Sequence, residues 1–211
     1  MNLAEGVLGI VLAGGRSSRM GGDDKYLRLL GGKPILARII EHLRPQVSDM
    51  VINANGEPQR LAAFGLPVVA DSVGGFAGPL AGVHAGLAWA QLTHPKLRYA
   101  VTVAADTPFF PRDLVRRFLA ELSDGARPLV ARSAAGVHPV IGLWPVRIAP
   151  ILEAALKQGT RKAGDFAKQQ EAIEVFFPPV ELGGKTVDPF FNINRPEDLN
   201  AAEALLRDAI A

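Results

Sequence analysis

Cysteine is absent from this chain of 211 residues, which excludes disulfides, thiolate metal sites and cysteine nucleophiles. No apolar run approaches the roughly 20 residues that a membrane-spanning helix needs. The N-terminal MNLAEGVLGIVLAGG lacks the basic start and the cleavage site of a signal peptide. We therefore expect a cytoplasmic protein with no membrane partner.

Aromatic residues and charge of one sign are also scarce. Aromatic residues make up 7% of the chain and the net charge is only +2. A nucleic-acid-binding protein usually has a long basic face with aromatic residues for stacking, so we expect no nucleic-acid partner. Hydrophobic residues, at 48%, suffice for a packed core, and the length suits one domain spanning 1–211.

Short apolar runs alternate with helical patterns in the first half of the chain. The pattern predicts strands at 7–12, 50–54, 67–70 and 99–105, and helices at 58–64, at about 113–122, and from Pro34 and Pro79 onward. Such alternation with short loops is typical of parallel strands joined by right-handed crossovers.

The rhythm changes in the second half. Apolar runs at 129–132 and 140–143 flank a turn-rich segment, which predicts an antiparallel excursion. Helices at about 147–157 and 161–170, a strand at 172–177 and a C-terminal helix from Pro196 follow. We predict an α/β fold with three Rossmann-like layers, in which helices cover both faces of a mostly parallel twisted sheet.

The loop LAGGRSSRMGGDDK after the first predicted strand has the composition of a phosphate-binding loop. Its four glycines let backbone amides approach an anion, and Arg19 and Lys25 supply charge against a polyphosphate. Ligands of open α/β sheets bind at the carboxyl ends of strands, where this loop lies. The loop is neither a Walker A sequence nor a dinucleotide fingerprint. A glycine-rich connection with exposed cations is the alternative, and the spacing of Arg19, Met20 and Lys25 disfavours it.

Polar residues end three other predicted strands. Asp106 follows the strand at 99–105, where a carboxylate suits Mg²⁺, although an Asp before Pro108 can also cap a helix. Asp71 either points into the same crevice or forms an Asx-turn with the following serine. Asn53 is unfavourable inside a strand, which supports a ligand role.

Three further positions each have two interpretations. Gly82 lies near the start of a predicted helix whose amides can face an anion, or it serves close packing. Asn192 and Asn194 present both amides on one face of an extended segment, as ligands or as turn caps. His138, before Pro139, either contacts a second substrate or is structural.

Together these motifs resemble the nucleotidyltransferases that share the sugar-nucleotide glycosyltransferase fold, and among them the molybdenum cofactor guanylyltransferases. The resemblance covers nearly the whole chain. The motifs that carry it occur in the family's order: LAGG at 12–15, SRMG at 18–21, DK at 24–25, NAN at 53–55, DS at 71–72, GPLAG at 78–82, DTPF at 106–109, HP at 138–139 and NIN at 192–194.

The resemblance implies transfer of GMP from GTP to the phosphate of molybdopterin carrying molybdenum, with release of pyrophosphate. It places the nucleotide in about residues 1–110 and the acceptor in about 111–211, and it allows transient contacts with other molybdenum-cofactor proteins. The implied catalytic residues are Arg19, Lys25 and Asp106, of which Asp106 holds Mg²⁺. The implied nucleotide-binding residues are Leu12, Ala13, Gly14, Gly15, Lys25, Asn53, Asp71 and Asp106, and the acceptor-binding residues are Gly82, Asn192 and Asn194.

Two alternatives remain open. Relatives that use CTP tend to carry Leu-Ala-Ala-Gly in the first loop, whereas this chain has Leu-Ala-Gly-Gly, which leaves room for a purine. A molybdopterin cytidylyltransferase, or another small-molecule nucleotidyltransferase, is therefore the nearest enzymatic alternative. A nucleotide-binding adaptor in cofactor assembly is the non-enzymatic one, and it has no need of a metal-binding Asp106.

Overall fold

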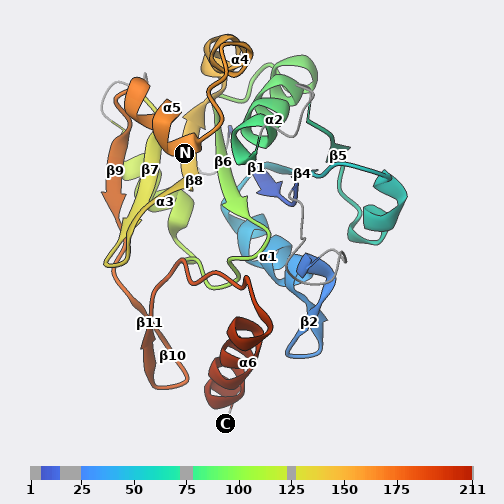
Figure 1. Cartoon of the computed structure of the whole chain (residues 1–211), viewed down its shortest axis with the longest axis vertical. Coiled ribbons are helices and arrows are strands. Elements are labelled where there is room, and N and C mark those ends of the chain that lie inside the picture. Colours follow the sequence, from blue (N-terminus) through green and yellow to red (C-terminus); the bar gives the residue numbers. More distant parts are fainter. Residues whose placement is uncertain (1–5, 15–24, 72–77, 123–126, 211) are drawn as a thin grey trace.

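The structure is a computed structural model that describes residues 6–14, 25–71, 78–122 and 127–210. A seven-stranded sheet with the order β5-β4-β1-β6-β8-β7-β9 forms its centre (Figure 1). The strands are β1 (Val7–Leu12), β4 (Asp49–Asn53), β5 (Val68–Val69), β6 (Tyr99–Ala104), β7 (Leu129–Ser133), β8 (Gly136–Pro145) and β9 (Ile173–Phe176). Within this sheet only β8 runs opposite to its neighbours β6 and β7, and the other neighbouring pairs are parallel. The predicted antiparallel excursion is thus confirmed.

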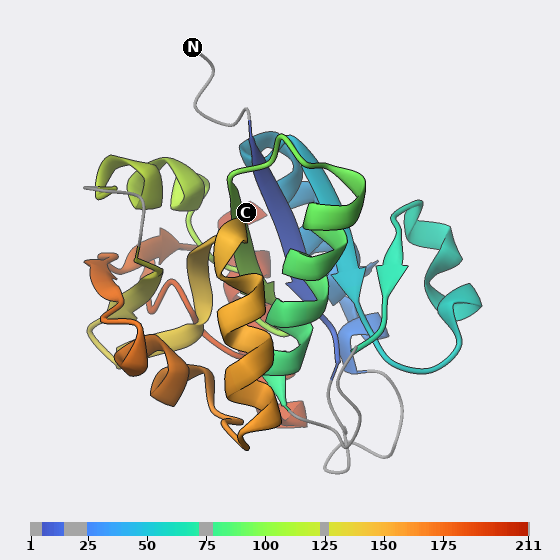
Figure 2. The ribbon, with the colours of Figure 1, turned by 90° about the horizontal axis from the view of Figure 1, so that it is seen from above.

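Helices cover both faces of the sheet (Figures 1 and 2). One core cluster packs α1 (Ile35–Leu43) and α3 (Leu114–Ala120) against the sheet, and a second packs α2 (Pro79–Thr93), α4 (Ala149–Lys157) and α5 (Ala163–Gln169). Every residue of β1 is buried, as expected for a central parallel strand whose two faces are both covered. The predicted three-layer α/β fold is confirmed.

Most predicted elements agree with the structure to within a few residues. The short helix at 58–64 is a 3₁₀ helix, η4 (Pro58–Phe64), and further 3₁₀ turns are η2 (Lys25–Leu27), η3 (Arg44–Gln46) and η5 (Val146–Ile148). The prediction for Pro34 is off by one residue, because this proline ends the short strand β3 and α1 begins at the next residue. Among the described residues, no helix has the length and apolar character required to cross a membrane.

Two small hairpins were not predicted. They are β2 (Leu29–Leu30) with β3 (Lys33–Pro34), and β10 (Val180–Leu182) with β11 (Lys185–Val187). Each turns on a Gly-Gly pair with φ of +57° and +71°, the positive values that a two-residue type I′ turn requires. The dipeptide between apolar residues was the available sequence signal.

The C-terminal helix α6 (Pro196–Ile210) lies between these hairpins (Figure 1). The Gly31 amide donates to the Glu203 carboxylate at 2.7 Å, and Lys185 Nζ lies 2.9 Å from the Asp208 carboxylate. These contacts hold the middle and the last turns of α6 against the two hairpins.

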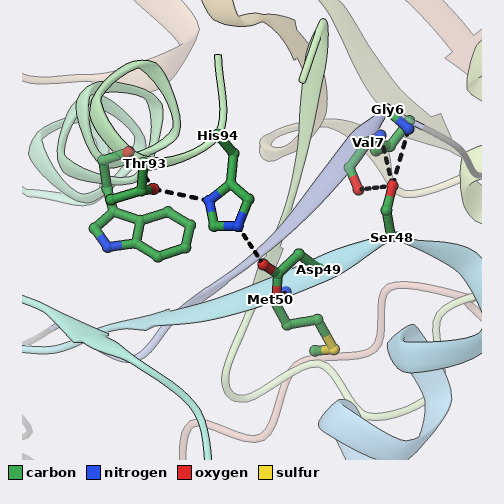
Figure 3. A network of polar contacts seen from close by, with 8 residues as sticks. Gly6, Val7, Ser48, Asp49, Met50, Thr93 and His94 are labelled. Carbon is green, nitrogen blue, oxygen red and sulfur yellow. Dashed lines mark hydrogen bonds and ion pairs between the residues drawn. The ribbon is translucent and has the colours of Figure 1, made fainter. Parts of the chain in front are cut away.

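A polar network ties together elements at the amino ends of β1 and β4 (Figure 3). Ser48 Oγ accepts hydrogen bonds from the amides of Gly6 and Val7 at 2.9 and 3.2 Å. His94, which follows α2, lies 3.0 Å from the Asp49 carboxylate and 2.8 Å from Thr93 Oγ1. These groups hold the end of α2 against the start of β4, so this edge of the sheet has a structural role.

Candidate functional site

The carboxyl ends of β1, β4 and β6 lie side by side at the opposite edge. Leu12 is in register with Asn53 on one side and with Ala104 on the other. The Ala13 amide continues this pairing by donating to the Asn53 carbonyl at 2.8 Å. Because the three strands are parallel, the residues that follow them meet in one place, which brings Asp106 close to the start of the first loop.

An amide–carboxylate network surrounds Asp71, just past β5. Asn53 Nδ2 donates to Asp71 Oδ1 at 2.9 Å and to the Val69 carbonyl at 3.1 Å. Asn55 Nδ2 donates to Asp71 Oδ2 at 2.8 Å, while Asn55 Oδ1 accepts the Asp71 amide at 3.0 Å. Asp71 is thus held in one orientation by two side-chain amides. Asn55 belonged to the NAN motif, but sequence reasoning assigned it no role.

Two predicted site glycines pack against Asn53. Asn53 is only 2% exposed. A Cβ on Gly14 would come within 3.1 Å of Asn53 Oδ1. A Cβ on Gly82 would overlap that oxygen and come within 2.8 Å of Asn53 Cγ and 2.9 Å of Leu12 Cδ2. Gly82 is buried in α2 against the Asn53 side chain, so the structure places it beside the Asp71 network, whereas the resemblance implied that it binds the acceptor together with Asn192 and Asn194.

Lys25 joins three segments that are distant in sequence. Its Nζ contacts Asp106 Oδ2 in an ion pair and donates to Asn194 Oδ1 at 2.9 Å. The side chains of Lys25 and Asp106 are 23% and 15% exposed, so the pair is largely shielded from water. The structure therefore brings a predicted phosphate ligand, a predicted metal ligand and a predicted acceptor ligand into direct contact.

The segment that carries Asn194 is fixed at two points. The Ile193 amide donates to the Asp106 carbonyl at 2.8 Å. Asp198 Oδ2, in the first turn of α6, accepts the amides of Asn194 and Arg195 at 2.8 and 2.9 Å, in the manner of a helix cap. Asn192 and Asn194 are exposed while Ile193 is buried, which is the predicted alternation. Sequence reasoning found the acidic first turn but not the capping role of Asp198.

The donor set at Asp106 suits a hard divalent cation that shares its coordination with phosphate oxygens and water. The described residues contain no cluster of three His, Cys, Asp or Glu side chains that could hold a metal by themselves. Asp106 offers one carboxylate, and Thr107 Oγ1 lies 3.4 Å from it. A cation on Asp106 Oδ2 would compete with Lys25 for the same oxygen. The predicted roles of Gly15 and Arg19 concern residues outside the described ranges.

The chain is similar to known proteins over most of its length. The family model of the MobA-like NTP transferase domain matches residues 9–173. A Bradyrhizobium protein named molybdenum cofactor guanylyltransferase is 47% identical over 94% of this chain and 92% of its own length.

Two solved structures share the fold. Molybdopterin-guanine dinucleotide biosynthesis protein A from Archaeoglobus fulgidus has a TM-score of 0.68 at 24% identity, covering 95% of this chain and 98% of its own. A Mycobacterium tuberculosis protein solved in complex with manganese has a TM-score of 0.64 at 19% identity, covering 94% and 98%.

Proposed function

Since the chain belongs to the MobA-like NTP transferase family, we propose that it transfers GMP from GTP to the phosphate of molybdopterin carrying molybdenum, releasing pyrophosphate. The name of the 47%-identical Bradyrhizobium relative, which matches nearly end to end, supports this substrate pair. The observation that carries the proposal is the contact of Lys25 with both Asp106 and Asn194.

The nucleotide lies on the β4 and β5 side of the site in this proposal. Asn53 and Asp71 form a fixed polar wall there, and a carboxylate can accept hydrogen bonds from the N–H donors of guanine or from ribose hydroxyls. Gly14 presents its backbone without a side chain beside that wall. We assign Leu12, Ala13 and Gly14 to the phosphate-facing end of the same surface.

The reaction needs no strong general base, because the attacking acceptor phosphate is already an oxyanion. The tasks of the protein are to align that oxygen with the α-phosphorus and to offset the accumulated negative charge. Lys25 lies between Asp106 and Asn194, so its ammonium group is placed where two phosphate-bearing substrates would approach each other.

We propose Mg²⁺ as the metal, with Asp106 as its protein ligand. When bound, such a cation supplies charge neutralisation to triphosphate oxygens. Asp106 is suited to this role by its place at the end of β6 and by its low exposure. Asn194, which accepts a hydrogen bond from Lys25, and Asn192, which is exposed two residues before it, are the proposed acceptor ligands.

Nucleotide choice is tested by measuring pyrophosphate release from GTP, CTP, ATP and UTP in the presence of Mg²⁺ and molybdopterin carrying molybdenum. We expect GTP to be preferred. A preference for CTP would replace the guanylyl assignment with the cytidylyl alternative. If none of the four nucleotides released pyrophosphate, the proposed nucleotidyltransferase activity would be refuted.

The role of Asp106 separates an enzyme from a nucleotide-binding adaptor. Asp106→Ala should abolish GMP transfer while leaving GTP binding measurable. Glu174→Ala is the matched control, because Glu174 is an exposed carboxylate on β9. Full activity of Asp106→Ala would refute the metal-ligand role of Asp106, whereas GTP binding without any GMP transfer by the unaltered chain would favour the adaptor. The single-domain organisation, the cytoplasmic location and the transient contacts with other molybdenum-cofactor proteins stay predictions from the sequence.

A further inference from the structure

A second polar cluster lies at the same edge of the sheet as Asp106, on the side away from Asn53. Ser133 ends β7, and His138 lies near the start of β8. Because β8 is antiparallel to β7, the end of one and the start of the other share the edge at which β1, β4 and β6 end. In the order β4-β1-β6-β8-β7, Asn53 therefore lies on one side of Asp106, and Ser133 and His138 lie on the other.

Ser133 stands between His138 and Asp188 in this cluster. Its Oγ lies 2.8 Å from His138 Nε2 and 2.5 Å from Asp188 Oδ2, and it accepts the Ala135 amide at 3.1 Å. A hydroxyl has one proton to donate, and an ionised carboxylate can only accept. The proton of Ser133 therefore goes to Asp188, and His138 must donate Nε2–H to Ser133 Oγ.

This arrangement differs from a hydrolytic triad. In such a triad the histidine stands in the middle and accepts the serine proton. Here the serine stands in the middle, its proton is committed to the carboxylate, and the residue is only 3% exposed. The cluster is therefore suited to holding chain segments in place rather than to nucleophilic attack.

An irregularity in the sheet aims His138 at Ser133. Val130 pairs with Gly142, but the next residue of β7, Ala131, pairs with His138. The extra residues of β8 begin with Pro139, which has no amide proton to give to a strand ladder. Bulges of this kind redirect side chains next to functional sites.

The cluster fixes one end of the segment that carries the acceptor asparagines. Asp188 Oδ1 accepts the Phe190 amide at 2.8 Å, and the His138 ring lies 4.7 Å from the Phe190 ring, centroid to centroid. The other end is held by the bond from the Ile193 amide to the Asp106 carbonyl. Residues 188–194 are thus held at one end by the cluster of Ser133, His138 and Asp188, and at the other end by the backbone of Asp106.

We propose that His138, acting through Ser133 and Asp188, is a positioning residue for the acceptor substrate, because it sets the path of the segment that presents Asn192 and Asn194. This inference rests on the proposed function. Burial lowers the pKa of His138 although Asp188 raises it, so the ring is neutral near pH 7 and carries the single proton on Nε2 that the bond to Ser133 requires.

Steady-state kinetics of the whole chain tests the proposal, with the KM values for GTP and for molybdopterin carrying molybdenum measured separately. Ser133→Ala and His138→Ala should each raise the acceptor KM about tenfold while changing the GTP KM by less than about twofold. His138→Gln should bring the acceptor KM back close to that of the unaltered chain, because the glutamine side-chain amide can donate a hydrogen bond from roughly the position that Nε2 of the histidine occupies. Val137→Ala is the matched control, since Val137 is an exposed neighbour on β8.

The outcomes separate this inference from the proposed function. An acceptor KM that stays within about twofold in both alanine variants, or a parallel rise of both KM values, would overturn the positioning role alone. No transfer by the unaltered chain would overturn the proposed function and this inference with it. If the alanine variants do not fold, ¹⁵N NMR of the unaltered chain tests whether Nε2 of His138 carries the proton. An unprotonated Nε2 would refute the hydrogen bond from His138 to Ser133 and with it the positioning role.

Discussion

Replacing Gly82 by alanine should damage nucleotide binding through the Asn53 side chain. Gly82 lies in α2, where alanine is intrinsically better than glycine by about 1 kcal/mol. The new methyl group would nevertheless overlap Asn53 Oδ1 and come within 2.9 Å of Leu12 Cδ2. The helix backbone cannot retreat without unpacking, so the Asn53 side chain must turn away.

The cost follows from the bonds that Asn53 would lose. Turning the side chain breaks the bond from Nδ2 to the Val69 carbonyl and the one to the Asp71 carboxylate. A neutral bond contributes about 0.5–1.5 kcal/mol and a bond to a charged group about 1.5–3 kcal/mol. After the helical gain of about 1 kcal/mol, the net loss of stability is about 2 kcal/mol, equivalent to a fall in Tm of roughly 4–8 °C for a chain of this size.

Gly86→Ala provides the comparison that separates packing from nucleotide binding. Gly86 lies on the same helix as Gly82, and its Cβ would approach Cγ1 of Ile10 on β1 to 2.8 Å, in an apolar environment without contact to Asn53. We expect both variants to lower Tm, but only Gly82→Ala to raise the GTP KM, by about tenfold. Gly164→Ala in α5, whose Cβ would meet Pro139 at an ordinary 3.4 Å, should leave the GTP KM nearly unchanged and raise Tm by no more than about 2–4 °C, the helical gain alone.

Thermal unfolding and steady-state kinetics of the three variants, measured side by side, decide the matter. Equal GTP KM values for Gly82→Ala and Gly86→Ala at similar losses of Tm would refute the link from Gly82 through Asn53 to the nucleotide.

The remaining predictions concern the metal ligand, the acceptor segment and pH. Lys25→Met should bind Mn²⁺ more tightly in calorimetry without nucleotide, because the substitution frees the Asp106 oxygen that Lys25 contacts. The same variant should transfer GMP about 10²-fold more slowly. Weaker Mn²⁺ binding would contradict the competition between Lys25 and the metal for Asp106. Asp198→Ala should lower the free energy of unfolding, measured in urea, by about 0.5–2 kcal/mol, because the helix loses its cap. It should also raise the acceptor KM more than the GTP KM. Glu197→Ala, in the same helical turn, is the control. The free energy of unfolding should reach its full value above pH 6.5 and fall as the pH drops below it, because the unfolded chain then binds protons that one buried and two partly buried histidines resist in the fold. Equal urea midpoints at pH 7.5 and 5.5 would contradict this. Burial lowers the pKa of each of these histidines, which are His42, His84 and His138.

Local sequence patterns were enough to predict the fold class and the strand ends that carry the site. The apolar run at 7–12, the glycine loop after it and the polar residues that end later strands are readable because burial on both faces and strand termination are local properties. Parallel strands then require that their carboxyl ends share one edge, so the sequence by itself predicts that Asp71 and Asp106 face the same crevice.

The partners of those residues depended on the tertiary structure. Lys25 meets Asn194 across 169 positions, and Ser133 meets Asp188 across 55, through the packing of a C-terminal segment along the sheet edge. No periodicity encodes such a contact, because the separation is set by how the intervening elements fold. The sequence by itself determined which chemical groups the site contains; the strand order and the bulge in β8 decided which of them touch, because hydrogen bonds depend on distances that only the folded chain defines.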